Sequence, residues 1–460
     1  MLESILLEYN RSSNTTKPLR VGVYTSPHIE FVRERIRIDG APISEGDFAE
    51  AFFRLWDLVQ AVDKQDRPFL SFFTFLTLLA FRVFLDKGID CAIIETGIGG
   101  LKDPTNILPH PHVTAITRLD LDHVGLLGQT IGEIAYHKGG IFKHSATALT
   151  MEQEPEGISQ LQSSAEAANV ALKISLPLHK NHRALMGIPG DHQLANAGLA
   201  VDIAQAWLLK NAPRAAIPAP PQEGTLPIFV QKGLRQATWP GRSDLQLTKD
   251  VAFFIDGANT SESIRCAATW YAEALLNRAR SRSPYARTAL IFNRTEDNKH
   301  ELLRVLHTTL RSLQHPQVEA ADAPPPPLFD LVVFCTNALT PQIQAPPDLV
   351  SLNPVPERDT TQQEDLARAW RALDSGSDSG AGKCEVRVVF SVAEAMVLVG
   401  MPPSGREMKR DSNLEGGGEG GGDGGSGGGQ QQHTACLVTG SLKLVGPCLT
   451  VLRRGAGEGV

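Results

Sequence analysis

The segment from residue 91 to residue 100 constrains the fold most tightly, because an apolar run ends abruptly in a carboxylate and a glycine-rich turn. It reads Cys-Ala-Ile-Ile-Glu-Thr-Gly-Ile-Gly-Gly, and Asp103-Pro104-Thr105-Asn106 follows shortly after it. Strands of a parallel sheet are buried on both faces and read as continuous apolar runs, and ligands of open α/β sheets bind at the carboxyl ends of such strands. The pattern therefore predicts a buried parallel strand that delivers Glu95 to a ligand site.

A second apolar run, from Val113 to Thr117, also ends in polar residues, because Asp120, Asp122 and His123 follow it closely. Carboxylate oxygens and an imidazole at two strand ends suit a divalent cation that also holds phosphate oxygens. The first hypothesis is therefore a metal-assisted nucleotide site. A glutamate at a strand end can also be a solvated cap or the partner of a nearby arginine.

The glycines that follow Glu95 do not make a dinucleotide-binding fingerprint. That fingerprint has the form G-x-G-x-x-G at the start of a helix, and here Asp103 and Pro104 occupy the region where the helix should open. A Rossmann-type oxidoreductase is therefore disfavoured relative to a metal-assisted nucleotide site.

Length and composition set the number of domains and exclude several kinds of partner. At 460 residues, 42% of them hydrophobic, the chain exceeds what one hydrophobic core usually organises, so two domains are expected. A net charge of -7 without a dense Lys/Arg run gives no footprint for nucleic acid. The six cysteines lack C-x-x-C spacing, which predicts reduced thiols in an intracellular protein, with neither disulfides nor zinc.

The most apolar window, from Phe69 to Leu85, predicts a buried core helix rather than a membrane span. Polar residues interrupt it, and it falls short of the ~20 residues that a span needs. The N-terminus has neither a signal nor a transit pattern, and Leu2 to Tyr9 reads as an amphipathic helix. No membrane association is expected.

Strand and helix patterns alternate along the chain and predict two α/β domains. The first spans residues 1–236, has a mostly parallel sheet and ends with a helix from Asp191 to Leu209. The second, a smaller domain over residues 237–460, contains a glycine-rich tract that makes residues 403–433 a disordered insertion. Its predicted strands are residues 251–255, 288–292, 331–335, 386–390 and 435–438, and the first three are followed by Asp256, Asn293 and Asn337.

Short motifs follow one another along the whole chain. They are Tyr24-Thr25-Ser26-Pro27-His28, Val32-Arg33-Glu34-Arg35-Ile36-Arg37-Ile38, Glu95-Thr96-Gly97-Ile98-Gly99-Gly100, Asp122-His123, Leu126-Leu127-Gly128, His137-Lys138-Gly139-Gly140-Ile141-Phe142-Lys143, Trp239-Pro240-Gly241-Arg242, Asp256-Gly257-Ala258-Asn259 and Thr439-Gly440-Ser441-Leu442. The ordered set closely resembles folylpolyglutamate synthase, of the Mur ligase superfamily, from Leu2 to the C-terminus. Each motif alone is weak, but their order and spacing together are specific.

The resemblance implies an ATP-dependent ligase of one-carbon metabolism, with a P-loop-type ATPase domain followed by a Rossmann-like domain. The terminal γ-carboxylate of a tetrahydrofolate polyglutamate would attack the γ-phosphate of ATP, and the amine of L-glutamate would then displace phosphate from the acyl phosphate. Holding two anions together while charge develops on phosphoryl oxygens needs Mg²⁺ and fixed cations. ATP and Mg²⁺ are thus the expected cofactors.

By resemblance, Ser26 and Glu95 are ligands of one Mg²⁺, and His123 is a ligand of a second. Lys138 matches the lysine that the family carbamylates to bridge the metals, so His123 and Lys138 are the expected catalytic residues. Taken singly, Ser26, Glu95 and His123 are better explained as a turn hydroxyl, a strand cap and a core histidine, and an ordinary surface lysine is the alternative for Lys138.

Nucleotide contacts are implied in both domains. Arg242 and Asp256 match contacts to ATP, since a guanidinium suits phosphate oxygens and a carboxylate suits ribose hydroxyls. Gln193 and Asn196 resemble residues of the nucleotide-side helix of the family. A plain polar helix face is the alternative for these two amides.

Substrate contacts are implied near the N-terminus. The arginines at 33, 35 and 37 fall two apart, so on a strand they would share one face and could attract glutamate carboxylates, with a solvated strand face as the alternative. Phe72 and Thr74 match a segment that lies by the folate in the family, where an aromatic face could stack on a pterin ring. Core packing is the alternative for Phe72. Arg33, Phe72 and Thr74 are the candidate substrate-binding residues.

One motif of the family, the phosphate loop G-x-x-G-K-[ST] expected just before Leu2, does not occur in the sequence. That loop cradles phosphates with backbone N–H groups and supplies a lysine and a hydroxyl. Because one such donor is worth roughly 3 kcal/mol, the chain as written is expected to be a feeble catalyst, truncated at its N-terminus.

Two other functions stay open, a non-catalytic folate-binding protein and dihydrofolate synthase, which shares the scaffold. The expected partners are tetrahydrofolate polyglutamates and L-glutamate, with neither nucleic acid nor a membrane, and the resemblance implies a monomer. The family works in the cytoplasm and in mitochondria, and a cytoplasmic location is expected here.

Overall fold

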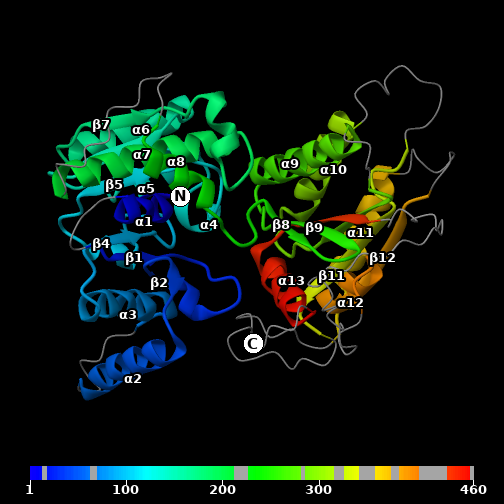
Figure 1. Ribbon diagram of the computed structural model, residues 1–460, viewed down its shortest axis with the longest axis horizontal. Helices are drawn as coiled ribbons and strands as arrows, with labels where there is room; N and C mark the ends of the chain where they lie inside the picture. The colour runs from blue at the N-terminus through cyan, green and yellow to red at the C-terminus, as the bar shows by residue number, and fades with distance from the viewer. Residues whose placement is uncertain are drawn as a thin grey trace, which may run out of the picture. The chain divides into compact units, whose positions relative to one another are not determined.

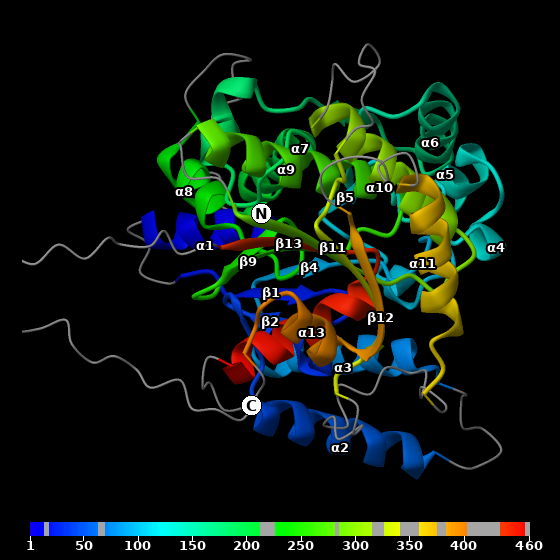
Figure 2. The same ribbon diagram turned by 90° about the vertical axis from the view of Figure 1, so that its right-hand side faces the viewer.

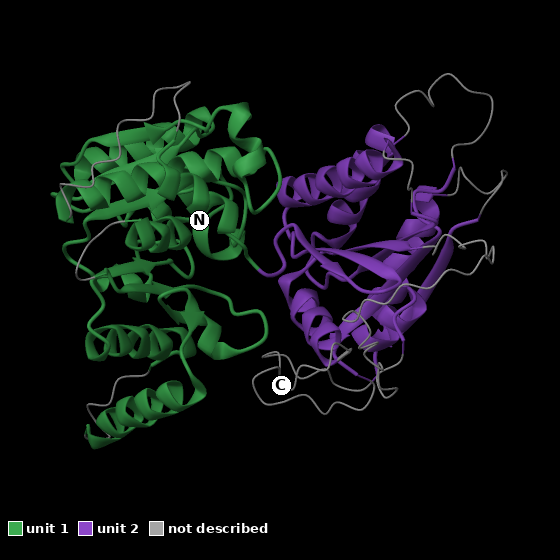
Figure 3. Ribbon diagram, viewed as in Figure 1, with its two compact units in different colours: residues 1–239 green, residues 240–460 purple. Residues whose placement is uncertain are grey.

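The computed structural model describes residues 1–12, 18–62, 70–211, 226–280, 285–314, 326–340, 358–374, 383–402 and 433–455. The chain divides into two compact units, Met1–Trp239 and Pro240–Val460, which Figure 3 colours separately. Each unit combines helices with parallel-rich sheets (Figure 1), so the predicted α/β fold class is confirmed. The insertion predicted for residues 403–433 lies outside the described residues, apart from its last residue.

Unit 1 begins with the predicted amphipathic helix and ends with a short helix near residue 236. Its elements are α1 (Leu2–Ser12), β1 (Val21–Tyr24), η1 (Val32–Arg35), β2 (Ile36–Ile38), β3 (Ala41–Pro42), α2 (Glu45–Ala61), α3 (Phe72–Asp86), β4 (Cys91–Ile94), η2 (Pro104–Ile107), β5 (Val113–Ile116), α4 (Val124–Leu127), α5 (Ile131–Gly139), β6 (Thr147–Met151), α6 (Pro155–Ala167), β7 (Leu172–Ser175), η3 (Lys180–Leu185), α7 (His192–Asn211) and α8 (Ile228–Gln236).

Within the described part of unit 1, the strands form two separate sheets. One has the order β3-β2-β1-β4, in which β1 pairs in parallel with β4 and antiparallel with β2. The other has the order β5-β6-β7 and is parallel throughout. The two apolar runs that suggested a metal site, β4 and β5, therefore belong to different sheets.

Local sequence explains why β1 and α3 lie together. Helix α3 starts at the N-cap Ser71, whose hydroxyl accepts a hydrogen bond from the backbone N–H of Thr74. Its inner face buries Leu79 and Val83 in a core shared with Tyr24 of β1. A glycine is required at Gly22 of β1, because an added Cβ would lie 2.8 Å from the Phe84 ring. The predicted core helix over 69–85 is thus confirmed for its described part.

The predicted strand that would align the arginines at 33, 35 and 37 is wrong. Residues Val32–Arg35 form a single 3₁₀ turn, and β2 begins only at Ile36. The cause is the Glu34 carboxylate, which accepts hydrogen bonds from the backbone N–H groups of Ile29 and Phe31, both at 2.9 Å. The chain therefore turns back before the strand starts, and the three arginines do not share a strand face.

Unit 2 contains the five predicted parallel strands and one antiparallel edge strand, β8. Its described elements are β8 (Asp244–Leu247), β9 (Val251–Asp256), α9 (Ser261–Arg280), β10 (Arg287–Phe292), α10 (Lys299–Gln314), β11 (Leu331–Ala338), α11 (Thr361–Asp374), β12 (Glu385–Ser391), α12 (Val392–Leu398), β13 (Thr434–Thr439) and α13 (Leu442–Gly455).

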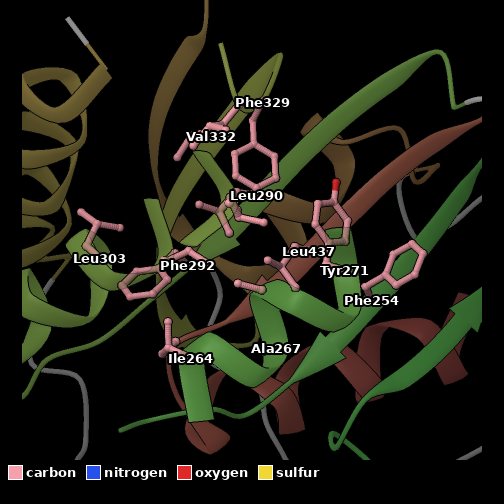
Figure 4. Close-up of a cluster of buried hydrophobic side chains, with 14 of the residues drawn as sticks. Phe254, Ile264, Ala267, Tyr271, Leu290, Phe292, Leu303, Phe329, Val332 and Leu437 are labelled. Atoms are coloured by element: carbon pink, nitrogen blue, oxygen red, sulfur yellow. The ribbon is translucent and has the colours of Figure 1, made fainter. Parts of the chain in front are cut away.

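These strands make one sheet of order β12-β11-β10-β13-β9-β8 among the described residues. In Figure 2, α9 and α10 lie on one side of this sheet and α13 on the other. Helices α9, α10 and α11 bury a single core with the strands, in which Tyr271 packs near Phe254 and Phe329 (Figure 4). The strands of this sheet therefore share one continuous core.

No helix in the described ranges is long and apolar enough to cross a membrane. The six cysteines all fall within described residues, and all of them are free.

Candidate active site

Ser26 and Glu95 meet where β1 and β4 end. The two strands pair in parallel with Tyr24 opposite Ile94, so their carboxyl ends coincide. The backbone N–H of Glu95 donates to the carbonyl of Tyr24 at 2.8 Å, and the backbone N–H of Ser26 donates to the Glu95 carboxylate at 3.0 Å. The structure therefore brings together two of the residues predicted to hold a metal.

The chemistry of this Ser26–Glu95 pair fits Mg²⁺. The Glu95 carboxylate is exposed and Ser26 is half-buried, so a carboxylate and a hydroxyl oxygen are available at one edge of the sheet. No group of three or more His, Cys, Asp or Glu side chains in the described residues could hold a metal. Mg²⁺ usually retains several waters and is held by one or two carboxylates together with substrate phosphates. A sparse oxygen site of this kind suits it.

The glycine turn after Glu95 is held by Asp103, a residue whose role the sequence patterns did not predict. The buried Asp103 carboxylate accepts hydrogen bonds from the backbone N–H groups of Gly97 and Ile98, both at 3.0 Å. Its other oxygen accepts from the backbone N–H of Thr105 at 3.0 Å, capping η2. An aspartate followed by proline and threonine is a helix-start signal and could have identified this anchor.

This turn packs against the end of α5, which carries Lys138. The backbone N–H of Leu101 donates to the carbonyl of His137 at 2.8 Å. A Cβ added at Gly100 would lie 2.9 Å from the carbonyl oxygen of His137 and 3.0 Å from that of Lys138, so only glycine permits this approach. The strand end that carries Glu95 and the helix end that carries Lys138 are consequently fixed to each other.

The Asp122 carboxylate interacts electrostatically with Lys138 and lies close to the His123 ring. Burial lowers the pKa of Lys138, while the negative charge of Asp122 acts to raise it. His123 is half-exposed, sits in the left-handed region at φ 51° as the N-cap of α4, and has its Nε2 atom 3.7 Å from an Asp122 oxygen. A lowered pKa increases the neutral fraction of the Lys138 amine, which is the form that reacts with CO₂.

The two amides predicted for the nucleotide side lie in the first turn of α7. The Asn196 amide donates to the Gln193 carbonyl oxygen at 3.0 Å, and the Gln193 amide nitrogen lies 2.9 Å from His192 Nε2. These contacts fix the two amides relative to each other and are compatible with either a nucleotide contact or a polar helix face.

In unit 2, Arg242 and Asp256 form a pair at the end of β9. Arg242 Nη1 lies 3.7 Å from an Asp256 oxygen. The other Asp256 oxygen accepts a hydrogen bond from the backbone N–H of Ser243 at 2.8 Å. A largely buried carboxylate thus orients a partly exposed guanidinium at the edge of the sheet where ligands of such folds bind.

The three residues predicted for substrate lie in unit 1, Arg33 on η1 and the other two in the first turn of α3. Phe72 is 49% exposed, and the guanidinium carbon of Arg35 lies 5.5 Å from the centroid of its ring. Thr74 lines a pocket of about 420 Å³ between α3 and η2, together with Thr77, Leu101, Asp103 and Asn106. Arg33 donates to the carbonyl of Ile43 at 3.2 Å. Phe73, not Phe72, packs inward and stacks on Tyr24.

Comparisons with known proteins point to one family. The chain is 33% identical over 453 residues to a probable folylpolyglutamate synthase of Schizosaccharomyces pombe, covering 98% of this chain and 80% of that protein. It is 32% identical over 462 residues to the folylpolyglutamate synthase of Neurospora crassa, covering 98% and 78%. A mitochondrial folylpolyglutamate synthase of Bos taurus is 36% identical over 340 residues, covering 69% and 55%. No family model matches the chain.

Solved structures agree on the fold. The folylpolyglutamate synthase of Mycobacterium tuberculosis complexed with ADP aligns with a TM-score of 0.66 at 22% identity, covering 98% of this chain and 87% of that one. E. coli FolC in complex with DHPP and ADP aligns with a TM-score of 0.61 at 20% identity, covering 100% and 85%. The fold is shared with these structures, and the extent of identity to the fungal relatives shows that the chain belongs to the folylpolyglutamate synthase family.

Proposed function

We propose that this chain is an ATP-dependent ligase that joins L-glutamate to the γ-carboxylate of tetrahydrofolate polyglutamates through an acyl phosphate. Family membership supports the reaction class. The observation that carries the proposal is the grouping of Ser26, Glu95 and Lys138, because a 3.0 Å hydrogen bond joins the first two and a packed glycine turn joins them to the helix end of the third.

The first step requires the substrate carboxylate and the γ-phosphate of ATP to approach although both are negative. Bound Mg²⁺ would supply the charge that stabilises the transferring phosphoryl oxygens. Ser26 and Glu95 would hold that ion, and His123 with a carbamate on Lys138 would hold a second. The proposed role of α5 is to keep the Lys138 amine partly buried, so that it is more easily neutral and able to accept CO₂.

Each unit contains candidate contacts for the nucleotide. The Arg242 guanidinium, oriented by Asp256, is suited to phosphate oxygens, and a carboxylate such as that of Asp256 is suited to ribose hydroxyls. Gln193 and Asn196 are proposed contacts on the unit 1 side. The proposal assigns ATP rather than a dinucleotide because the fingerprint of the latter is incomplete after β4.

Folate would lie against Phe72 and Thr74. The half-exposed Phe72 ring offers a face for stacking, and the pocket lined by Thr74 combines apolar side chains with polar ones such as Lys102, Asp103 and Asn106. Arg33 stays a candidate for a carboxylate of the glutamate tail, since its Nε atom is buried without a hydrogen-bond partner in the described residues.

In the second step the amine of glutamate attacks the acyl carbon, phosphate leaves with the former carboxylate oxygen, and the amine loses a proton.

The test is product analysis with the full chain, ATP, Mg²⁺ and L-glutamate, offering either tetrahydrofolate or dihydropteroate. Mass spectrometry should detect tetrahydrofolate extended by glutamate, and Glu95→Gln serves as the matched inactive control. Ligation only to dihydropteroate would favour dihydrofolate synthase, and folate binding without ATP hydrolysis would favour the non-catalytic protein.

A monomer acting on small molecules, without nucleic acid or a membrane as partner, is the simplest arrangement for a two-unit ligase. We propose a cytoplasmic location, with a mitochondrial form as the alternative that the name of the bovine relative supports. Size-exclusion chromatography with light scattering tests the first point, and imaging of a C-terminally tagged chain tests the second.

A further inference from the structure

Arg35 is a buried charge beside the Ser26–Glu95 pair, and the mechanism above does not use it. It is the last residue of the 3₁₀ turn η1 and is only 8% exposed. Arginines are seldom buried to this degree, because removing a charge from water is costly unless hydrogen bonds and opposite charges compensate. A specific role for its contacts is therefore expected.

Arg35 holds both ends of the short loop that carries Ser26. Its backbone carbonyl accepts a hydrogen bond from the N–H of Thr25 at 2.9 Å, and its Nε–H donates to Nδ1 of His28 at 3.0 Å. Ser26 lies between these two attachment points. A planar guanidinium also lies over the Phe72 ring, at 5.5 Å from the ring centroid, which orients the group from its other side.

The neighbouring residue, Glu34, fixes the next part of the same chain. Its carboxylate accepts from the backbone N–H groups of Ile29 and Phe31 at 2.9 Å each, and from that of Glu30 at 3.2 Å. The segment from Thr25 to Phe31 therefore has a defined course although it contains neither helix nor strand. The side chains of Glu34 and Arg35 both contribute to this course.

The charge of Arg35 is also placed to act on Glu95. Burial lowers the pKa of Arg35, and the charges of Tyr24 and Glu95 act in the opposite direction. An arginine starts from a pKa far above neutrality, so the guanidinium stays protonated. The protonated guanidinium therefore attracts the Glu95 carboxylate, the proposed metal ligand.

We propose that Arg35 is a positioning residue for the metal site, which holds His28 and the Thr25 to His28 loop so that the Ser26 hydroxyl and the Glu95 carboxylate address the same cation. This inference rests on the proposed function, because it concerns the cation that Ser26 and Glu95 would bind. A lysine could not replace Arg35, since one ammonium cannot both donate along the plane to His28 and stack on Phe72.

The test measures the affinity of the full chain for Mn²⁺, by the electron paramagnetic resonance signal of the free ion, in the presence of ADP. Arg35→Lys should weaken Mn²⁺ binding about tenfold, the usual effect of removing a partner that orients a metal ligand. The Mg²⁺ concentration for half-maximal ligation should rise by the same factor. Arg37→Lys is the matched control, because Arg37 bonds instead to Glu3 and to the carbonyl of Gly40.

A second variant keeps the inference falsifiable if Arg35→Lys folds poorly. His28→Ala removes the acceptor of the 3.0 Å hydrogen bond while leaving the buried arginine in place, and it should weaken Mn²⁺ binding to a similar degree. The double variant should be no weaker than either single variant, since both remove one interaction. A lower melting temperature with unchanged Mn²⁺ affinity in both variants would overturn the inference alone. If the unmodified chain neither binds Mn²⁺ nor forms product, the proposed function fails and this inference fails with it.

Discussion

The polar residues that follow parallel strands at their carboxyl ends have different environments in the two units. In unit 1, β4 ends at Glu95, whose exposed carboxylate accepts a hydrogen bond from the loop after β1. In unit 2, β10 is followed by Asn293, which is 1% exposed and bonds to Asn337 at 2.8 Å and to Gln363 at 2.9 Å. The first end leaves a carboxylate accessible to a ligand, whereas the second end satisfies its polar groups internally.

This difference teaches that position in the fold does not by itself make a site. Both ends follow an apolar strand of a parallel sheet, the place where ligands of such folds bind. The three amides of Asn293, Asn337 and Gln363, here called the amide network, lock strand ends to α11 and act as structure. Asp256 is intermediate, because it is largely buried yet leaves Arg242 partly exposed.

The largest expected effect tests the open end. Glu95→Gln should reduce the ligation rate on the order of 100- to 1000-fold, because an amide oxygen is a poor ligand for a hard cation near transferring phosphate. The exposed position predicts a change in unfolding free energy within about 0.5 kcal/mol. Initial rates and urea unfolding measure the two quantities. A large loss of stability with unchanged rate would show that Glu95 is a structural cap.

Sequence reasoning found Glu95 for a physical reason that it could not extend to its neighbours. The apolar run of β4 and the glycine turn are local features, so a carboxylate at a strand end was predictable. The roles of Arg35 and Asp103 depend on contacts with residues that only the fold brings near, such as His28 and the N–H groups of the turn. The prediction that the arginines at 33, 35 and 37 share a strand face was wrong. Their alternation with other residues suggested a strand, but the Glu34 carboxylate stabilises a turn there.

The five parallel strands of unit 2 were equally predictable from the sequence, because buried parallel strands read as apolar runs. All five lie close to their predicted ranges. The roles of the polar residues at their carboxyl ends were not predictable. An aspartate or asparagine after such a strand looks the same in sequence whether it will meet a ligand or another amide. Only the placement of Gln363 on α11, seventy positions away from Asn293, distinguishes the two cases.

The second prediction tests the closed end. Asn293→Leu should lower the unfolding free energy by about 3 kcal/mol, because it leaves buried polar groups of Asn337 and Gln363 without partners. Chemical denaturation measures this change, with Asn181→Leu at an exposed position as the matched control. If the variant is as stable as the parent but binds substrate poorly, the amide network is part of a ligand site and the comparison breaks.

The third prediction concerns the intermediate case. Asp256→Asn should weaken ADP binding about tenfold, because the neutral amide orients Arg242 less firmly and accepts ribose hydrogen bonds less strongly. Arg242→Lys should have a similar effect, since a lysine cannot contact two phosphate oxygens in a fixed fork. Isothermal titration calorimetry gives both affinities. Unchanged ADP affinity in both variants would mean that the pair stabilises unit 2, as the amide network does.

The smallest expected effect is on the pH dependence of carbamate formation at Lys138. Its folded pKa is lowered by burial, so at a given pH its neutral fraction exceeds that of an exposed lysine. A carbamate forms from the neutral amine and CO₂, and occupancy should therefore reach its plateau at a lower pH than in a lysine-containing peptide, a difference of less than about tenfold in occupancy at neutral pH. Between the folded and unfolded pKa values of Lys138, the unfolded chain binds the extra proton, so the stability of the fold rises with pH across that window.

¹³C NMR with labelled bicarbonate measures the carbamate, and Lys138→Arg is the control that should abolish the signal. A carbamate that titrates like that of the peptide would mean that the open end of unit 1 leaves Lys138 an ordinary surface amine, and the contrast between the two units would then rest on Glu95 alone.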